Sequence, residues 1–363
     1  MGYWDRSTVG KFVTIIAPDS LECKSVSLRR VIMESSSAAT SPSSNSSSGI
    51  SRVLNKLRDS VNNGNYYEAH QMYRTLYFRY LNQKKYTDLL ALLFDGAEIF
   101  FEKDQEASGI DLTQLIIDTL VKSSTEGNSN NQLFSKLTKL LSRIRPDNLQ
   151  RDEIISSALK WSKSVNNVNN KQASGHPGLH ECIANMFWRE NNFVLARYHF
   201  LHSSDGRNFA LMLIQVHRER GYASEIDLFI AQVVLQYLCL QNKVTAHQTF
   251  ENYTSKHPNI RTSGPPYYLP LLNFIWFLLK VIETGKLVAF NTLCQQYQTS
   301  IKRDPAYADY LNKIGQLFFG IQPARPAAPV GGFFGNILSS LMSNLEEGND
   351  FDDEDDNEPT ALA

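Results

Sequence analysis

The residues whose types could do metal or nucleophile chemistry gather in the middle of this 363-residue sequence. Residues 176–182 read His-Pro-Gly-Leu-His-Glu-Cys, which places two imidazoles, a carboxylate and a thiol close together. Such groups bind zinc, and a thiol beside a histidine is a pair used in covalent catalysis. However, Pro177 and Gly178 are typical of a helix entrance, and nothing indicates a lowered thiol pKa at Cys182. We favour a turn here and keep a hydrolase using Cys182 and His180 only as the weakest alternative.

A second pair of histidines, His199 and His202, lies one helical turn apart, with Asp205 beyond. We interpret these side chains as packing and helix-end contacts. The sequence has no phosphate-binding P-loop, dinucleotide-binding glycine pattern, Gly-x-Ser-x-Gly elbow or His-Glu-x-x-His pair. We therefore expect no catalytic residue, no cofactor and no metal site, and a protein that is not an enzyme.

The formal net charge of −1 hides an uneven distribution. Residues 341–363 hold nine acidic and no basic side chains, and residues 1–50 carry a net +1, so the span 51–340 carries +7. This positive charge is diffuse and forms no arginine-rich stripe with interleaved aromatic residues, which a nucleic-acid surface would show. We expect no nucleic acid as a partner, and rank a helical nucleic-acid binder below the protein-binding hypotheses.

Cysteine usage and hydropathy indicate the compartment. The four cysteines, at positions 23, 182, 239 and 294, form no Cys-x-x-Cys pair, as expected of reduced, buried thiols in the cytosol. The longest apolar run, 269–282, is shorter than the roughly 18 to 20 residues of a membrane span and contains Asn273 and Lys280. The apolar run 12–17 is too short for a secretory signal. We expect a cytosolic protein with no direct membrane insertion.

Helices must position these side chains, because strand-like alternation is nearly absent. The clearest pattern runs from residue 63 to 101. Asn65 can cap a helix whose Tyr66 begins an apolar stripe at spacings of three and four, and Glu68 completes a capping box. A second apolar run starts at Tyr86. Together these runs predict an antiparallel helical hairpin, the unit from which helical solenoids are stacked.

Similar patterns continue along the chain. Ser108 and Asp111 have capping-box spacing, which predicts a helix start just before Leu112. Prolines and a glycine between residues 257 and 266 predict a loop or short hairpin. We expect an all-α fold, a right-handed solenoid of stacked antiparallel helical hairpins resembling degenerate tetratricopeptide repeats, with disordered ends. The later predicted helices are 132–144, 148–161, 180–189, 193–202, 207–220, 224–240, 244–255, 268–282, 286–297 and 306–319.

Composition divides the chain into four regions. Residues 1–49 are predicted to be a disordered leader, because nine of the fourteen residues from 35 to 48 are serine. Residues 50–203 form an N-terminal helical-repeat half, and residues 204–322 form a C-terminal half. Residues 323–363 are predicted to contain a linker, a short amphipathic helix from 333 to 345 and an acidic disordered tail.

Several separate stretches resemble one known family in the same order. Residues 65–76 read Asn-Tyr-Tyr-Glu-Ala-His-Gln-Met-Tyr-Arg-Thr-Leu, and residues 271–279 read Leu-Leu-Asn-Phe-Ile-Trp-Phe-Leu-Leu. With residues 197–203, 264–266 and 314–320, they resemble the Golgi-to-ER traffic protein 4 family, also described as the 35-kDa subunit of the transmembrane-domain recognition complex. The resemblance extends from about residue 51 to 345.

The resemblance implies a non-enzymatic scaffold that hands tail-anchored membrane proteins to a targeting ATPase for insertion into the endoplasmic reticulum. In such a family the N-terminal half docks the ATPase. The C-terminal half binds a ubiquitin-like protein, a large BAG-family scaffold, or both, and the BAG-family arrangement is favoured here. The alternative is a helical-repeat adaptor or co-chaperone that binds peptide tails.

The resemblance also implies two sets of docking residues, each with a simpler rival interpretation. Arg52 and Lys56 are as well explained as solvated charges, and Asp111 as a helix cap. Trp276 lies in so apolar a run that a core position is the stronger interpretation. The ATPase-docking set is Arg52, Lys56, Tyr66, Glu68, Arg79 and Asp111, and the C-terminal partner-docking set is Tyr267, Tyr268, Trp276 and Phe290.

Overall fold

The computed structural model describes residues 46–123, 131–166, 174–262 and 264–322, and these residues form helices joined by turns and loops, with no strand among them. The predicted all-α fold is confirmed. The predicted features at 1–45 and 323–363 lie outside the described residues. The α-helices are α2 Ser46–Asn62, α3 Tyr66–Asn82, α4 Tyr86–Glu102, α5 Glu106–Lys122, α6 Asn131–Leu141, α7 Leu149–Asn166, α8 Pro177–Arg189, α9 Phe193–Leu201, α10 Gly206–Arg220, α11 Ile226–Cys239, α12 Lys243–Lys256, α13 Pro270–Thr284, α14 Leu287–Gln296, α15 Gln298–Ile301 and α16 Ala306–Phe319, with a 3-10 turn at Ala223–Glu225.

Most helices lie where the apolar periodicity predicts them, and their ends are set by short capping interactions. The side chains of Asn192, Asp205 and Asn242 accept backbone N–H groups at the starts of α9, α10 and α12. These bonds satisfy donors that a helix start leaves without a partner. The first helix begins at Ser46, four residues before the predicted boundary at residue 50.

The predicted capping box at Ser108 and Asp111 is wrong. Helix α5 begins at Glu106, so Ser108 and Asp111 lie inside it. The start is fixed earlier because Asp104 adopts a left-handed conformation, with φ 55°, and ends the preceding turn. Glu106 is also held there, since its carboxylate pairs with Arg145 at 2.8 Å.

The same tight turn joins several consecutive helices. In each, one residue takes a positive φ, and the next residue donates its N–H to the carbonyl five positions back, at 2.8–3.0 Å. This geometry closes the last turn of one helix and redirects the chain into the next. The left-handed residues of these five turns are Gly64, Lys84, Asp104, Asn191 and Gln241, so only one of the five is glycine.

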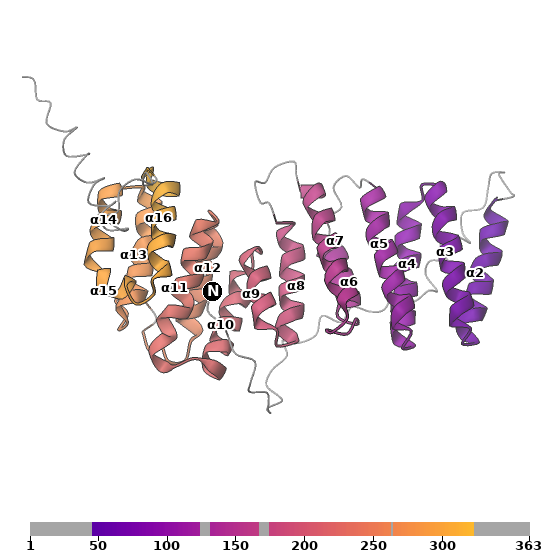
Figure 1. Cartoon of the computed structure of the whole chain (residues 1–363), viewed down its shortest axis with the longest axis horizontal. Helices are drawn as coiled ribbons and strands as arrows, with labels where there is room; N and C mark the ends of the chain where they lie inside the picture. The colour runs from indigo at the N-terminus through magenta and orange to yellow at the C-terminus, as the bar shows by residue number, and fades with distance from the viewer. Residues whose placement is uncertain (1–45, 124–130, 167–173, 263, 323–363) are drawn as a thin grey trace, which may run out of the picture. The chain divides into compact units, whose positions relative to one another are not determined.

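The chain divides into two compact units, one reaching Leu76 and one starting at Tyr77. In the first, α2 is followed by most of α3, and Leu57, Ala69 and Tyr73 are buried. In the second, helices pack both against their neighbours in the chain and against helices further along it (Figure 1). The packed pairs include α4 with α5, α8 with α9, α10 with α12, and α11 with α16.

Buried tyrosines link the helices of the second unit. The Tyr237 hydroxyl on α11 donates to the Phe200 carbonyl on α9 at 2.8 Å, and the Tyr253 hydroxyl on α12 donates to the Ile226 carbonyl at 2.9 Å. Each ring fills core space while its hydroxyl satisfies a backbone carbonyl. No helix among the described residues is long and apolar enough to cross a membrane.

Candidate docking surfaces

The first unit presents a charged pair between α2 and α3. The Lys56 ammonium lies 2.7 Å from the Glu68 carboxylate, and the Ser60 hydroxyl donates to the same carboxylate at 3.2 Å. The hydrogen bond and charge of Lys56 lower the pKa of Glu68. Lys56 and Glu68, twelve positions apart in the sequence, therefore form one ion pair that joins α2 to α3. Their pairing is open to solvent and is weakened by salt.

The remaining N-terminal candidates differ in exposure. Arg52 and Arg79 are exposed, whereas Tyr66 is half-buried. Asp111 is also half-buried, inside α5. Whether any of them contacts an ATPase stays a prediction.

Two exposed aromatic side chains on α3 were not among the docking residues predicted from the sequence. Tyr67 is 80 % exposed beside half-buried Tyr66, and Phe78 is 56 % exposed beside buried Tyr77. Adjacent residues on a helix point about 100° apart, so only one ring of each neighbouring pair faces the core. In the sequence, the consecutive aromatic residues Tyr66-Tyr67 and Tyr77-Phe78 indicate that one ring of each pair is exposed. Aromatic residues are enriched in protein–protein interfaces, so each ring is an additional docking candidate.

The C-terminal candidates separate into core and surface. Phe290 is completely buried and stacks on Phe319, with 4.6 Å between ring centroids. Tyr267 is 7 % exposed and meets the Phe250 ring edge-on. Their burial corrects the prediction that these two side chains lie on the docking surface. Phe290 belongs to the buried face of α14, and Tyr267 packs from the loop before α13 against Phe250 on α12.

Tyr268 and Trp276 are accessible. Tyr268 is 95 % exposed, and half-buried Trp276 meets the ring of Phe277 edge-on at 4.9 Å. Phe277 is itself 42 % exposed, although it was not among the C-terminal docking residues predicted from the sequence. Asn273 holds the preceding loop in place, because it accepts the Tyr267 N–H at 2.7 Å and donates to the Tyr267 carbonyl at 2.8 Å.

The histidine-rich stretch forms a helix entrance and a buried pair. The His176 ring accepts the Gly178 N–H at 3.0 Å and caps α8, which confirms the predicted turn. His180 and His199 face each other with 2.9 Å between their Nδ1 atoms. Because His180 Nε2 lies 3.3 Å from the Ser174 carbonyl, which can only accept, His180 Nδ1 must accept from His199 Nδ1–H. Burial lowers the pKa of His180 to about 4 and that of His199 to about 3.

Cys182 and His202, whose side chains could in principle serve as a nucleophile or a metal ligand, instead lie in structural environments. Burial raises the pKa of the Cys182 thiol, so the reactive thiolate is disfavoured. His202 contacts the Ser174 hydroxyl at 3.1 Å through its Nδ1 atom. Among the described residues, no group of three or more His, Cys, Asp and Glu side chains is arranged to hold a metal ion.

The fold and these surfaces define an all-helical protein of the hairpin-repeat class, whose exposed aromatic and charged side chains suit protein docking. A family model described as Golgi to ER traffic protein 4 matches residues 83–345. The chain belongs to this family. Five of the six predicted ATPase-docking residues precede the matched range, and Asp111 lies within it.

Individual relatives match over most of their length. The Golgi to ER traffic protein 4 homolog of Xenopus tropicalis is 48 % identical over 314 residues, covering 86 % of this chain and 94 % of the relative. The human homolog is 46 % identical and covers 86 % of this chain and 93 % of its own length. The crystal structure of C. therm. Get4 superposes with a TM-score of 0.67 at 23 % identity, over 86 % of this chain and all of that one, which shows a shared fold.

Proposed function

We propose that this protein is a non-enzymatic cytosolic scaffold that hands tail-anchored membrane proteins to a targeting ATPase for insertion into the endoplasmic reticulum. The observation that carries the proposal is its similarity, over nearly their whole length, to relatives named Golgi to ER traffic protein 4 homologs. Helices that present exposed charges and aromatic rings suit such a role, since docking needs surfaces rather than a reaction centre.

The α2–α3 pair is the proposed ATPase-docking feature. Lys56 supplies a positive charge whose position is fixed by Glu68, and exposed Arg52 and Tyr67 lie on the same two helices. A charged surface of this kind accelerates association and gives salt-dependent binding. The single variants K56E and E68K each break the ion pair, whereas the double variant K56E/E68K restores it with reversed polarity.

Titration of the purified full chain with the targeting ATPase tests this assignment. We expect K56E to weaken binding about tenfold at low salt, and K56E/E68K to recover the ion pair but not the affinity, because the ATPase responds to the sign of the charge. The matched control is K160E, at an exposed position on α7. Full recovery of affinity in the double variant, or equal weakening in K160E, would contradict the assignment.

The surface formed by Tyr268, Trp276 and Phe277 is proposed to bind the second partner, a ubiquitin-like protein or a large BAG-family scaffold. Exposed and half-buried aromatic side chains are the usual centre of binding energy in such interfaces. We expect Y268A and W276A each to weaken capture of that partner by at least about tenfold. Y222A is the control, because Tyr222 is 74 % exposed at another place. Unchanged capture by both variants would remove this surface from the proposal.

A second candidate function is an adaptor that binds apolar peptide tails directly. It is favoured by one observation, three exposed apolar side chains on the short helix α9, namely Val194 at 70 %, Leu195 at 37 % and Tyr198 at 50 %. Binding of isolated tail-anchor peptides to the chain without the ATPase, lost in V194S/Y198S, would favour the adaptor. No binding without the ATPase favours the scaffold.

A further inference from the structure

One arginine of the second unit carries its charge into a largely neutral environment. Arg197 on α9 is half-buried, and its Nη2 donates to Gln232 Oε1 at 2.9 Å and Gln236 Oε1 at 3.1 Å, both on α11. The ion pairs formed by the described residues do not include Arg197. Burial lowers its pKa, and only the tyrosines Tyr310 and Tyr307 oppose that effect. A desolvated guanidinium bound only by neutral groups lacks the anion that normally offsets its burial.

Two lysines, Lys313 on α16 and Lys243 at the start of α12, extend this positive charge. Gln236 Nε2 lies 3.1 Å from the Tyr310 hydroxyl, and Cys239 Sγ lies 3.6 Å from the Tyr310 carbonyl, so Arg197 and the end of α11 meet the same part of α16. Exposed Lys313 follows on α16, where its charge acts on Cys239. Lys243 lies over the Phe318 ring, 5.3 Å from its centroid.

Apolar side chains flank these cations. Leu240, directly after α11, is 44 % exposed, and Leu317 on α16 is 37 % exposed. We call Arg197, Lys243, Lys313, Leu240 and Leu317 the basic-apolar strip. A strip that combines uncompensated cations with exposed leucines suits an acidic peptide containing apolar residues better than a free phosphate, which offers nothing to the leucines.

The chain itself contains a segment with that chemistry. Residues 341–363 include nine acidic side chains and no basic one, and Phe351 stands between Asp350 and Asp352. The first acidic residue of the run, Glu346, follows Gln322 by 24 positions. A chain of that length reaches up to about 80 Å, whereas the fourteen residues of α16 span about 21 Å.

The end of α16 also directs the chain back toward the helix. Gly320 takes a left-handed conformation, with φ 69°, and the Ile321 N–H donates to the Gly315 carbonyl at 3.2 Å. Such a cap reverses the chain, so that Ile321 lies back against Gly315 of the helix it has just left. A segment tethered to the end of α16 has a high effective concentration at any site within its reach.

We propose that the acidic residues 346–358 dock on the basic-apolar strip of their own chain, with a carboxylate at Arg197. The segment thereby supplies the missing counter-charge. Any partner that uses this face of α11 and α16 must first displace the segment. This inference does not depend on the proposed function, because it concerns contacts within one chain.

Zero-length carbodiimide cross-linking of the full chain, followed by peptide mass spectrometry, tests the proposal. We expect Lys243 and Lys313 to link to carboxylates in 346–358 at least about fivefold more often than exposed Lys103 and Lys160, and the excess to vanish near 1 M salt, where the screening length is about 3 Å. R197Q should reduce the excess, whereas R143Q, at an exposed position, should not. An equal mixture of ¹⁴N- and ¹⁵N-labelled chains separates links within one chain from links between copies.

Three outcomes would overturn the proposal. They are links no more frequent at Lys243 and Lys313 than at Lys103 and Lys160, links mainly between differently labelled chains, and an excess unaffected by salt. If R197Q fails to fold, a full chain with all nine tail carboxylates changed to amides replaces it. In that variant, acylation of Lys243 and Lys313 should rise about threefold over the unaltered chain, while that of Lys103 and Lys160 stays the same. Equal acylation in both chains would refute the docking.

Discussion

His180 and His199 share one proton between their Nδ1 atoms, 2.9 Å apart, in the buried contact between α8 and α9. A second pair repeats the arrangement, since His257 Nε2 lies 3.0 Å from His217 Nδ1 between α12 and α10. In the second pair His257 Nδ1 accepts the Asn259 N–H at 3.2 Å, and His217 Nε2 meets the Tyr222 carbonyl at 2.9 Å. In the second pair every hydrogen bond is satisfied only when both rings are neutral. In the first pair, burial disfavours the charged form of both rings.

Acid should destabilise the fold through these pairs. The folded pKa is lowered to about 4 for His180, about 3 for His199 and about 4 for His257, against an unfolded value near 6.5. The unfolded chain then binds more protons, so stability is complete above about pH 6.5 and falls as the pH drops toward the folded values. Each group contributes up to about 1.4 kcal/mol per pH unit in that window.

Urea unfolding at several pH values between 7.5 and 5 measures this slope. H199Q keeps a polar side chain and removes one titrating ring, so its stability should depend less on pH than that of the unaltered chain. Identical slopes in the two proteins, or a stability that stays constant from pH 7 to 5, would contradict the neutral-pair account.

Breaking the Asp227–Arg303 pair should be costly. Asp227 is completely buried, and its Oδ2 lies 2.5 Å from Arg303 Nη1. Arg303 also donates to the Ser224 carbonyl at 2.8 Å. We expect R303Q to cost about 3 kcal/mol of unfolding free energy, because it leaves a buried carboxylate without its counter-charge. D227N/R303Q should recover part of the loss. Additive losses in the double variant would show that the two side chains act independently.

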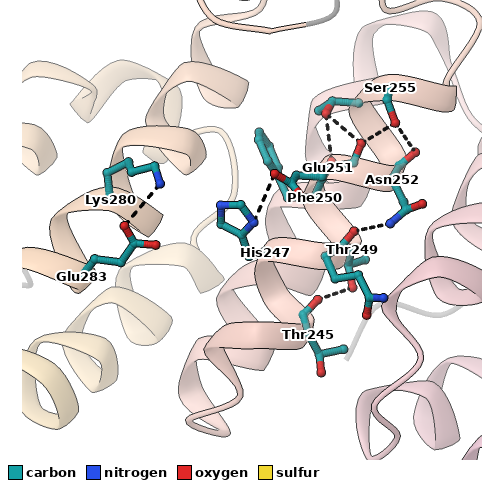
Figure 2. A network of polar contacts seen from close by, with 11 residues as sticks. Thr245, His247, Thr249, Phe250, Glu251, Asn252, Ser255, Lys280 and Glu283 are labelled. Carbon is teal, nitrogen blue, oxygen red and sulfur yellow. Dashed lines mark hydrogen bonds and ion pairs between the residues drawn. The ribbon is translucent and has the colours of Figure 1, made fainter.

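Gly206 should tolerate no side chain. A Cβ atom there would lie 2.6 Å from Thr249 Oγ1 and 2.9 Å from the Thr245 carbonyl, on the stretch of α12 where Thr249 donates to Thr245 (Figure 2). We expect G206A to lose about 1–3 kcal/mol by forcing α10 and α12 apart. G264A is the matched control, since nothing lies within 4 Å of a Cβ at that position. Similar thermal unfolding of the two variants would show that α10 and α12 separate easily.

The split between core and surface in the C-terminal aromatic set gives another test. F290A should cost about 3–5 kcal/mol, because it leaves a cavity beside Phe319, whereas Y268A should change stability by less than about 0.5 kcal/mol. Denaturant unfolding of the two variants checks the difference. Comparable losses in both would place Tyr268 in the core.

The helices could be predicted from sequence more readily than their connections. Apolar spacing placed α9, α13 and α16 within a few residues, because one buried stripe decides where a helix can lie. The turns could not be recognised, since Lys84 and Gln241 adopt the left-handed conformation that glycine usually signals. The predicted helix start at Ser108 was wrong because its side chain suits a helix cap but lies inside the helix. The backbone turn at Asp104 starts α5 earlier, at Glu106.

The candidate sites show a similar limit. Residue type alone ranked Phe290 and Tyr268 together, although one is buried and the other is 95 % exposed. Phe290 is buried by the packing of α14 against its neighbours, whereas Tyr268 lies in the loop before α13, and no pattern within a single helix contains that information. The Lys56–Glu68 pair likewise depends on how two helices meet.

We propose that this chain holds two different proteins at separate surfaces. Sedimentation-velocity analysis of the full chain mixed with the targeting ATPase and with the ubiquitin-like or BAG-family partner tests it directly. We expect a ternary complex at low salt, in which K56E releases only the ATPase and W276A releases only the second partner. Mutually exclusive binding, or a chain that sediments alone beside both proteins, would contradict it.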